Sequence, residues 1–214
     1  TGSGAVVKHT YSTVGPHTAV VTATNLVSQR TDKTVVQVDV PIAGLKAFNN
    51  GPTILGQVTT FSATISAGSN EAYLWDFGDG AFDSGAAVSH TYLTAGPHTA
   101  IVTVTNSVGR QTVQTVVMVE EAITLLLAHN DGPTIWGEMS TLSATIVNGT
   151  HVSYTWDFDD GYGANGMVVT HTYLLPGNYV AEVTATNLVS SETAITVVRV
   201  RAVFSVYLPV VMKP

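Results

Sequence analysis

The sequence contains no cysteine and few charged residues, and each shortage excludes a class of protein. Without cysteine there is neither a disulfide framework nor a thiolate metal site. Charged residues form 11% of the 214 residues, whereas about 25% is usual in a soluble domain. The net charge of −7 argues against nucleic acid or an anionic membrane surface as a partner.

Long apolar runs and a leader sequence are also missing. Residues 1–4, Thr-Gly-Ser-Gly, lack the basic and then apolar layout of a signal peptide, so we expect a mature, trimmed or fragmentary chain. The longest apolar-rich stretch, residues 202–212, is interrupted by Ser205 and Pro209 and is shorter than the ~20 residues of a membrane-spanning helix. Because 45% of the chain is nevertheless hydrophobic, the sequence predicts a folded protein with no membrane span.

Self-similarity at a fixed period organises the chain. Three motifs recur at a constant step of 81 residues: His-Thr-Tyr starts at 9, 90 and 171, Gly-Pro-Thr-Ile starts at 51 and 132, and Thr-Asn ends at 25, 106 and 187. This period has the size of one β-sandwich domain and not of one solenoid turn. We therefore expect full domains at 41–120 and 121–200, the C-terminal half of a domain at 1–40, and a tail at 201–214.

Apolar residues alternate with polar ones inside the middle repeat. Two segments, residues 58–66 and 98–106, each place a row of apolar side chains on one face: Phe61, Ala63 and Ile65, and Ala100, Val102 and Val104. Turn-forming Asn, Gly and Pro separate such segments, and no useful window has a 3.6-residue period. The pattern predicts six or seven short strands in each full repeat, enough for an all-β sandwich of two sheets.

The most distinctive segment is Trp75-Asp-Phe-Gly-Asp-Gly80, which returns at residues 156–161 with Asp159 in place of the first turn glycine. With the downstream His-Thr-Tyr, a glycine, and the strand that closes at Asn106, it resembles the PKD (polycystic kidney disease) domain over nearly the whole chain. The resemblance implies tandem immunoglobulin-like sandwiches, two complete and one partial. It also implies an extracellular or cell-surface, non-catalytic module, of the kind found in secreted hydrolases, surface-layer proteins and adhesins.

The two ends of the chain are complementary in kind. Residues 1–40 align with 82–121 and predict strands at 5–11, 17–25 and 31–40. Half a sandwich leaves one apolar face uncovered, formed by Val6, Ala19, Val21 and Ala23. The tail continues where a fourth repeat would start, and its Phe204, Val206 and Leu208 align with Ile123, Leu125 and Leu127, the expected opening strand of the third repeat.

Two hypotheses follow from these ends, and both stay open at this stage. In the first, the chain is a structural subunit of a filament or surface fibre, and the tail of one copy completes the first repeat of the next. In the second, it is part of a longer array, an accessory spacer or a carbohydrate- or protein-binding module of a secreted hydrolase or adhesin. The expected partners are accordingly other copies of the chain, neighbouring domains of a longer chain, or polysaccharide.

Catalysis is not expected, because no catalytic motif occurs and the seven histidines mostly occupy repeated strand positions. The tyrosine that follows His90 and His171 by two residues is expected to act like a tyrosine corner. Aspartates at the repeated turn form the one candidate calcium site: Asp76, Asp79, Asp157 and Asp160. Aspartate in turns also accepts hydrogen bonds from its own backbone amides, and we favour that structural role without a cofactor.

Three tryptophans remain to be placed. Trp75 and Trp156 lie in alternating strands and are expected in the sandwich cores. Trp136 lies in a predicted loop, where the middle repeat has Leu55, and is the candidate for contact with a carbohydrate or protein ligand.

Overall fold

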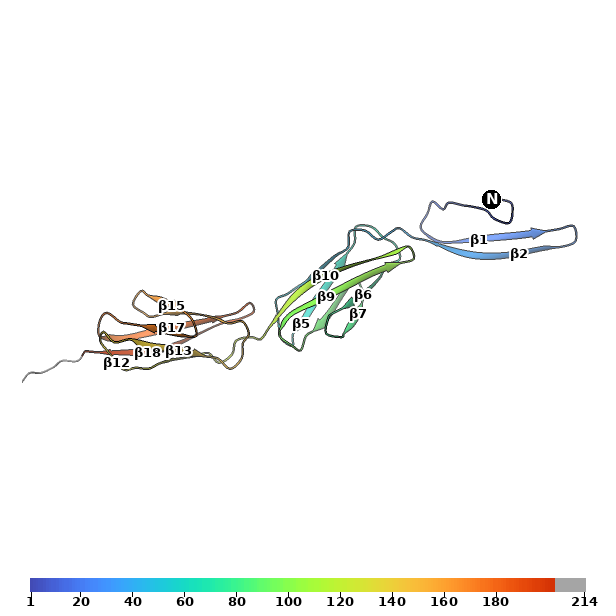
Figure 1. Cartoon of the computed structure of the whole chain (residues 1–214). Coiled ribbons are helices and arrows are strands. Elements are labelled where there is room, and N and C mark those ends of the chain that lie inside the picture. Colours follow the sequence, from blue (N-terminus) through green and yellow to red (C-terminus); the bar gives the residue numbers. More distant parts are fainter. Residues whose placement is uncertain (203–214) are drawn as a thin grey trace, which may run out of the picture. The chain divides into compact units, whose positions relative to one another are not determined.

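The computed structural model describes residues 1–202, and every regular element in that range is a β-strand (Figure 1). The chain divides into two compact units, one formed by residues 1–51, 57–92 and 97–118 and the other by residues 52–56, 93–96 and 119 onward, and each is described by itself. No helix among the described residues is long and apolar enough to cross a membrane.

The first repeat is built on a two-stranded hairpin. Strands β1 (Gly15–Thr24) and β2 (Gln29–Val38) pair antiparallel along their whole length, and the residues before β1 fold back beside them (Figure 1). Asn25 shapes the connecting turn, because its side-chain oxygen accepts the amides of Val27 and Ser28 at 2.8 Å each. Among residues 1–202 no third strand joins this sheet.

The middle repeat is a sandwich of two sheets. Its strands are β3 (Lys46–Asn49), β4 (Thr53–Ile54), β5 (Val58–Thr64), β6 (Ala72–Asp76), β7 (Phe82–Ser84), β8 (Ala87–Thr91), β9 (Gly96–Asn106) and β10 (Gly109–Glu120). One sheet has the order β4-β10-β9-β6-β7 and the other the order β3-β5-β8. At the edge of the larger sheet β4 runs parallel to β10, with Thr53 opposite Val119.

The third repeat has the same architecture. Its strands are β11 (Leu127–Asn130), β12 (Thr134–Ile135), β13 (Ser140–Thr145), β14 (Ser153–Asp157), β15 (Gly163–Asn165), β16 (Val168–His171), β17 (Gly177–Thr186) and β18 (Ser191–Arg201). They form sheets of order β12-β18-β17-β14-β15 and β11-β13-β16. Each full repeat is thus an immunoglobulin-like sandwich, as predicted, but with more strands than expected. The additional ones have only two or three residues, too few to show an alternation.

Tryptophan and small apolar residues fill the two cores. Trp75 and Trp156 are 0% and 1% exposed, and their indole nitrogens donate to the carbonyls of Gly85 and Gly166 at 3.1 Å. On the neighbouring strands of the same sheets, Trp75 pairs with Val102 of β9 and Trp156 with Val183 of β17. The inward-facing residues of these two strands are all fully buried: Ala100, Val102 and Val104, and Ala181, Val183 and Ala185. The core placement predicted for both tryptophans and for the two alternating strands is confirmed.

Two strand predictions were wrong. Residues 5–11 form bends and irregular chain, because the strand that pairs with their counterpart β8 in the middle repeat, β5, has no equivalent among the described residues of the first. The opening strand of the third repeat begins only at Leu127, because Leu125 adopts a positive φ of 53° and turns outward. Ile123 and Leu126 are the buried residues there. The tail residues aligned with this segment, from residue 203, lie outside the described residues.

Candidate functional site

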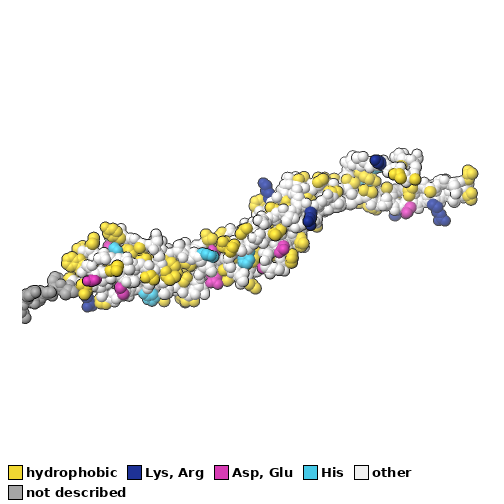
Figure 2. Space-filling model, viewed as in Figure 1, with side chains coloured by type: hydrophobic (Ala, Val, Ile, Leu, Met, Phe, Trp, Pro, Cys, Tyr) yellow, Lys and Arg dark blue, Asp and Glu magenta, His cyan; other side chains and the backbone are white. Residues whose placement is uncertain are grey.

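The open face of the hairpin is the first candidate site. Val21 of β1 is 62% exposed, whereas Val102 and Val183, at the same position of the full repeats, are both 0% exposed. Val36 of β2 is 38% exposed, against 1% for Val117 and 0% for Val198 at its equivalents. Apolar side chains are visible at the surface of this hairpin in Figure 2. The sequence therefore provides a core face that the described chain leaves partly exposed.

A cavity of about 700 Å³ lies over this face. It is lined by residues 2–7 on one side and by residues 19–22 and 32–34 of the two strands on the other. Of the residues predicted for assembly, Ala19 and Val21 line it. Val6 also lines it and is 87% exposed, and Ala23 is exposed at the end of β1. Phe204, Val206 and Leu208, the other predicted assembly residues, lie outside the described residues.

A histidine in each full repeat is held by an aromatic ring and a carboxylate. His90 stacks on Phe77 with 4.3 Å between ring centroids, and its Nε2 lies 2.7 Å from Asp79 Oδ2. In the third repeat His171 stacks on Phe158 at 4.3 Å and lies 2.6 Å from Asp160 Oδ2. Most of each imidazole is buried. In the middle repeat the His–Asp pair joins the turn after β6 to β8, and in the third repeat it joins the turn after β14 to β16.

The turn aspartates use their remaining oxygens on backbone amides. Asp76 Oδ1 accepts the amide of Gly78 at 2.9 Å, and Asp79 Oδ1 accepts that of Ala81 at 3.1 Å. Burial would raise the pKa of Asp79, but its hydrogen bonds with His90 and Ala81 outweigh burial and hold the pKa below the usual 3.8. Asp157 and Asp160 bind the amides of Asp159 and Tyr162 in the same way.

This arrangement has the structural role that we favoured for the candidate calcium residues. In residues 1–202 no group of three or more histidine and acidic side chains is placed to hold a metal ion. Of the carboxylate oxygens that a hard cation would need, both of Asp79 and of Asp160 and one of Asp76 and of Asp157 already take part in protein hydrogen bonds. The calcium assignment itself stays a prediction.

The tyrosines after these histidines differ between the repeats. Tyr92 donates its hydroxyl proton to the carbonyl of Phe77 at 3.1 Å, and burial, followed by the charge of Asp79, raises its pKa to about 12. Tyr173 is equally buried and burial raises its pKa further, but its hydroxyl has no hydrogen-bond partner among the described residues. Of the two full repeats, as far as residues 1–202 show, the middle one alone therefore has the corner-like hydrogen bond.

Trp136 is only partly fixed. Its indole nitrogen donates to the carbonyl of Leu174 at 3.0 Å, and its amide donates to the carbonyl of Arg201 at 2.9 Å. The side chain is nevertheless 54% exposed, so one part of the ring is available for a contact. Its role as a ligand contact stays a prediction.

Sequence reasoning missed a polar network around Asp39, directly after β2. Its carboxylate accepts hydrogen bonds from the Ser69 hydroxyl at 3.2 Å, from the side-chain amide of Asn70, and from the Ser107 amide at 3.3 Å. The bonds from Ser107, Asn70 and Gln37, in that order, hold the pKa of Asp39 well below its usual value. We call this set the Asp39 network.

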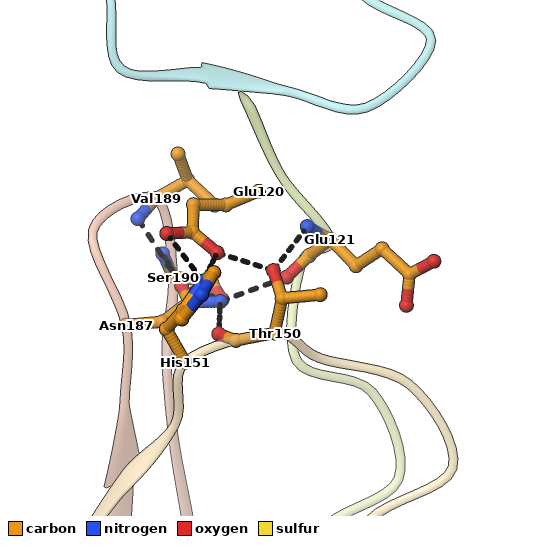
Figure 3. A network of polar contacts seen from close by, with 7 residues as sticks. All are labelled: Glu120, Glu121, Thr150, His151, Asn187, Val189 and Ser190. Atoms are coloured by element: carbon orange, nitrogen blue, oxygen red, sulfur yellow. Dashed lines mark hydrogen bonds and ion pairs between the residues drawn. The ribbon is translucent and has the colours of Figure 1, made fainter. Parts of the chain in front are cut away.

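A second network, 81 residues on, surrounds Glu120 at the end of β10 (Figure 3). Glu120 is 1% exposed. Its carboxylate accepts hydrogen bonds from the Thr150 hydroxyl and from Nδ1 of His151, the latter at 3.0 Å. Burial opposes the charge, but Thr150 and then His151 lower the pKa of Glu120 below its usual 4.5. Thr150 also accepts the amide of Glu121 at 2.9 Å, so one hydroxyl bridges two consecutive residues of the chain.

An asparagine completes each network. The side chain of Asn187 donates to the carbonyls of Glu121 at 2.7 Å and Thr150 at 3.1 Å (Figure 3), while Asn106 donates to those of Val40 at 2.8 Å and Ser69 at 3.1 Å. The sequence carried a signal for both networks, because the two acidic residues, at 39 and 120, are 81 residues apart, and so are Asn106 and Asn187. Without coordinates nothing showed that these residues meet.

Comparison with known proteins places this architecture in a family. The family model of the PKD domain matches residues 47–119 and 127–200. Human Polycystin-1 is 30% identical over 201 residues, which cover 89% of this chain and 5% of that protein. Human Polycystin-1-like protein 1 is 30% identical over 171 residues, 69% of this chain and 6% of that protein. The chain thus spans about a twentieth of the length of these relatives.

Two solved structures are also similar to this chain. The amphioxus IgVJ-C2 molecule has a TM-score of 0.43 at 17% identity, over 69% of this chain and 99% of that one. The N-terminal four Ig domains of Dscam1 isoform 1.9 have a TM-score of 0.45 at 15% identity, over 82% of this chain and 51% of that one. On the strength of the two family-model matches, the chain belongs to the PKD domain family.

Proposed function

We propose that this chain is a non-catalytic, extracellular structural module whose incomplete first repeat is closed by β-strand addition from another polypeptide. The observation that carries the proposal is the exposure of Val21 and Val36 at positions that are buried in both full repeats. An uncovered core face next to strand edges with no partner among the described residues is a template for a further strand. PKD and immunoglobulin-like domains are generally non-catalytic, which supports a structural role.

Copies of the chain are the proposed partner. β9 and β10 of the middle repeat are flanked by β6 and β4, and these two positions are open beside β1 and β2. The tail sequence offers apolar residues at every second position, Phe204, Val206 and Leu208, as a donated strand requires. Tail-to-hairpin pairing is a heterologous contact, so repetition of it builds a filament or surface fibre.

Light scattering at increasing concentration tests this assembly. We expect the full chain to associate and Val21→Asp to abolish association, because the charge would enter the closed core. Val35→Asp is the matched control, since Val35 of β2 is already 62% exposed, does not line the cavity, and has equivalents in the full repeats, Val116 and Val197, that are exposed as well. A chain that stays monomeric at all concentrations, or equal behaviour of the two variants, would contradict assembly between copies.

A second candidate function is an accessory array that spaces a catalytic domain from its substrate or binds polysaccharide. The exposed part of Trp136 favours it, because aromatic rings stack on sugar faces. Retardation of the chain in gels that contain polysaccharide, lost in Trp136→Ala, would support this role. Equal migration of the two proteins in every gel would remove the observation on which it depends.

A further inference from the structure

A groove crosses the outer face of the small sheet in the middle repeat. Its volume is about 650 Å³, within the range of about 300–1,000 Å³ that is usual for ligand sites. It runs over all three strands of the sheet, β3, β5 and β8, and reaches β7 of the larger sheet. Its lining includes an aromatic ring and several polar side chains, all from the first compact unit: Phe48, Asn50, Thr60, Ser62, Asp83 and Ser89.

The register of the strands arranges this lining in two rows. Phe48 lies opposite Ser62, which in turn lies opposite Ala87. In the second row Thr60 lies opposite Ser89. Paired residues of neighbouring strands project to the same side of a sheet, and the residues that alternate with these on β5 are buried. Both rows therefore face away from the core.

The groove contains polar groups that the protein does not use. Asn50 Oδ1 accepts the amide of Thr60 at 2.9 Å, which holds the side chain in place. Asp83 Oδ1 accepts the next amide of the chain at 2.7 Å. Among residues 1–202 neither the side-chain nitrogen of Asn50 nor Oδ2 of Asp83 has a partner, and the same is true of the hydroxyls of Thr60, Ser62 and Ser89.

The third repeat shows which of these groups are particular to the middle one. It also has hydroxyl residues at the three equivalent positions, 141, 143 and 170, so the hydroxyls belong to the common surface of this sheet. Three other positions change in kind, because Phe48, Asp83 and Ala87 are replaced by His129, Ala164 and Val168. Of the two full repeats, the middle one alone thus combines a phenyl ring, a carboxylate and the space left by a small residue.

We propose that this groove binds a polysaccharide chain of uncharged sugar units. The ring of Phe48 is 49% exposed, and the negative face of an aromatic ring attracts the polarised C–H groups of a pyranose. The free nitrogen of Asn50 donates to sugar hydroxyls, and the free oxygen of Asp83 accepts from them. Because Asn50 is already held by the amide of Thr60, it loses little conformational freedom on binding.

The charge of the groove determines the class of sugar. Among the described residues that line it, Asp83 is the only charged one, and the whole chain has a net charge of −7. A uronate or a sulfate would therefore meet a carboxylate with no cation beside it, which disfavours acidic polysaccharides. The inference is independent of strand addition, and it assigns polysaccharide binding to a different surface from that of Trp136.

An array of immobilised hexasaccharides tests the proposal, with neutral glucose, mannose, xylose and galactose oligomers beside acidic galacturonate. The full chain should bind at least one neutral oligomer and no galacturonate. Phe48→Ala should weaken that binding about tenfold, because it removes the stacking ring. Phe82→Ala is the matched control and should bind like the wild type, since Phe82 of β7 is 60% exposed and does not line the groove.

Two further variants test the space and the charge. Ala87→Val introduces the residue that the third repeat has at this position, so it should fold normally and weaken binding by filling the groove. Asp83→Asn keeps the size of the side chain and removes its charge. It should bind the neutral oligomer within about threefold of the wild type, because a neutral hydrogen bond is weaker than a charge-assisted one, and it should also bind galacturonate.

The outcomes separate this inference from the other proposals. Failure to bind any neutral oligomer, binding of galacturonate as tight as that of neutral sugar, or equal binding by Phe48→Ala and Phe82→Ala overturns it. Binding that is lost in Trp136→Ala and kept in Phe48→Ala overturns it as well and assigns the polysaccharide to the third repeat. Strand addition is tested by self-association alone, so neither result depends on the other.

Discussion

The buried carboxylate of Glu120 yields the most discriminating stability prediction. Glu120→Ala removes the acceptor of the Thr150 hydroxyl and of His151 Nδ1. A hydrogen bond to a charged group is worth about 1.5–3 kcal/mol. His151 is 64% exposed on its side chain, so water replaces its lost partner, and most of the loss comes from Thr150. We therefore expect a loss of about 2 kcal/mol in the free energy of unfolding.

Differential scanning calorimetry gives the measurement and Glu121→Ala the control. The control removes the same charge one residue further on, and its carboxylate points away from the network in Figure 3. For a domain of this size 1 kcal/mol corresponds to about 4–8 °C, so Glu120→Ala should lower one melting transition by about 8–16 °C. Glu121→Ala should change it by less than about 0.5 kcal/mol.

The pH dependence supplies a second check on Glu120. Its pKa in the folded state is lowered from 4.5, so its stabilisation is complete above pH 4.5 and is lost as the pH falls through the lowered value. The difference between the wild type and Glu120→Ala should thus be constant from pH 7 to about 5 and should then shrink. Equal effects of the two alanine substitutions at pH 7 would refute the role assigned to Glu120.

Three further predictions concern the cores and the turns. Tyr92→Phe should lower the free energy of unfolding in urea by about 1 kcal/mol, because a hydrogen bond is lost. Tyr173→Phe should leave it unchanged or raise it, and a larger loss for Tyr173→Phe than for Tyr92→Phe would contradict the reasoning. Trp156→Ala should cost about 3–5 kcal/mol and abolish the cooperative melting of the third repeat in calorimetry, which a retained transition would disprove. EDTA should leave the melting temperature unchanged because Asp79 is satisfied by protein groups, and a fall that added calcium reverses would show that the turn holds an ion.

Local patterns predicted the interior of each sandwich well. The alternation in β9 and β17 and the tryptophan before each Asp-Gly turn identify buried positions, because a strand with one buried face must repeat every second residue. The constant step of 81 residues then transferred each assignment from one repeat to the next.

Features that depend on distant partners were not predictable. Residues 5–11 resemble a strand in sequence, yet a strand forms only where a neighbour supplies its hydrogen bonds. Leu125 fits an alternating pattern, but its positive φ is set by the path of the chain into β11. Asp39 contacts Ser107, 68 residues away in sequence, and no local periodicity reports such a pair.

The two acidic networks have a consequence for the inheritance of the array. Coding repeats of equal length are prone to unequal exchange, and loss of one period would join Asp39 directly to Glu121. Aspartate, one methylene shorter, would then face Thr150 and His151 in place of Glu120, without the side-chain amide of Asn70 that it meets in the present chain. Asp39 and Glu120 thus meet different residues in the loops that they contact, Asn70 and His151, so we expect a chain shortened at this point to have a less stable network there.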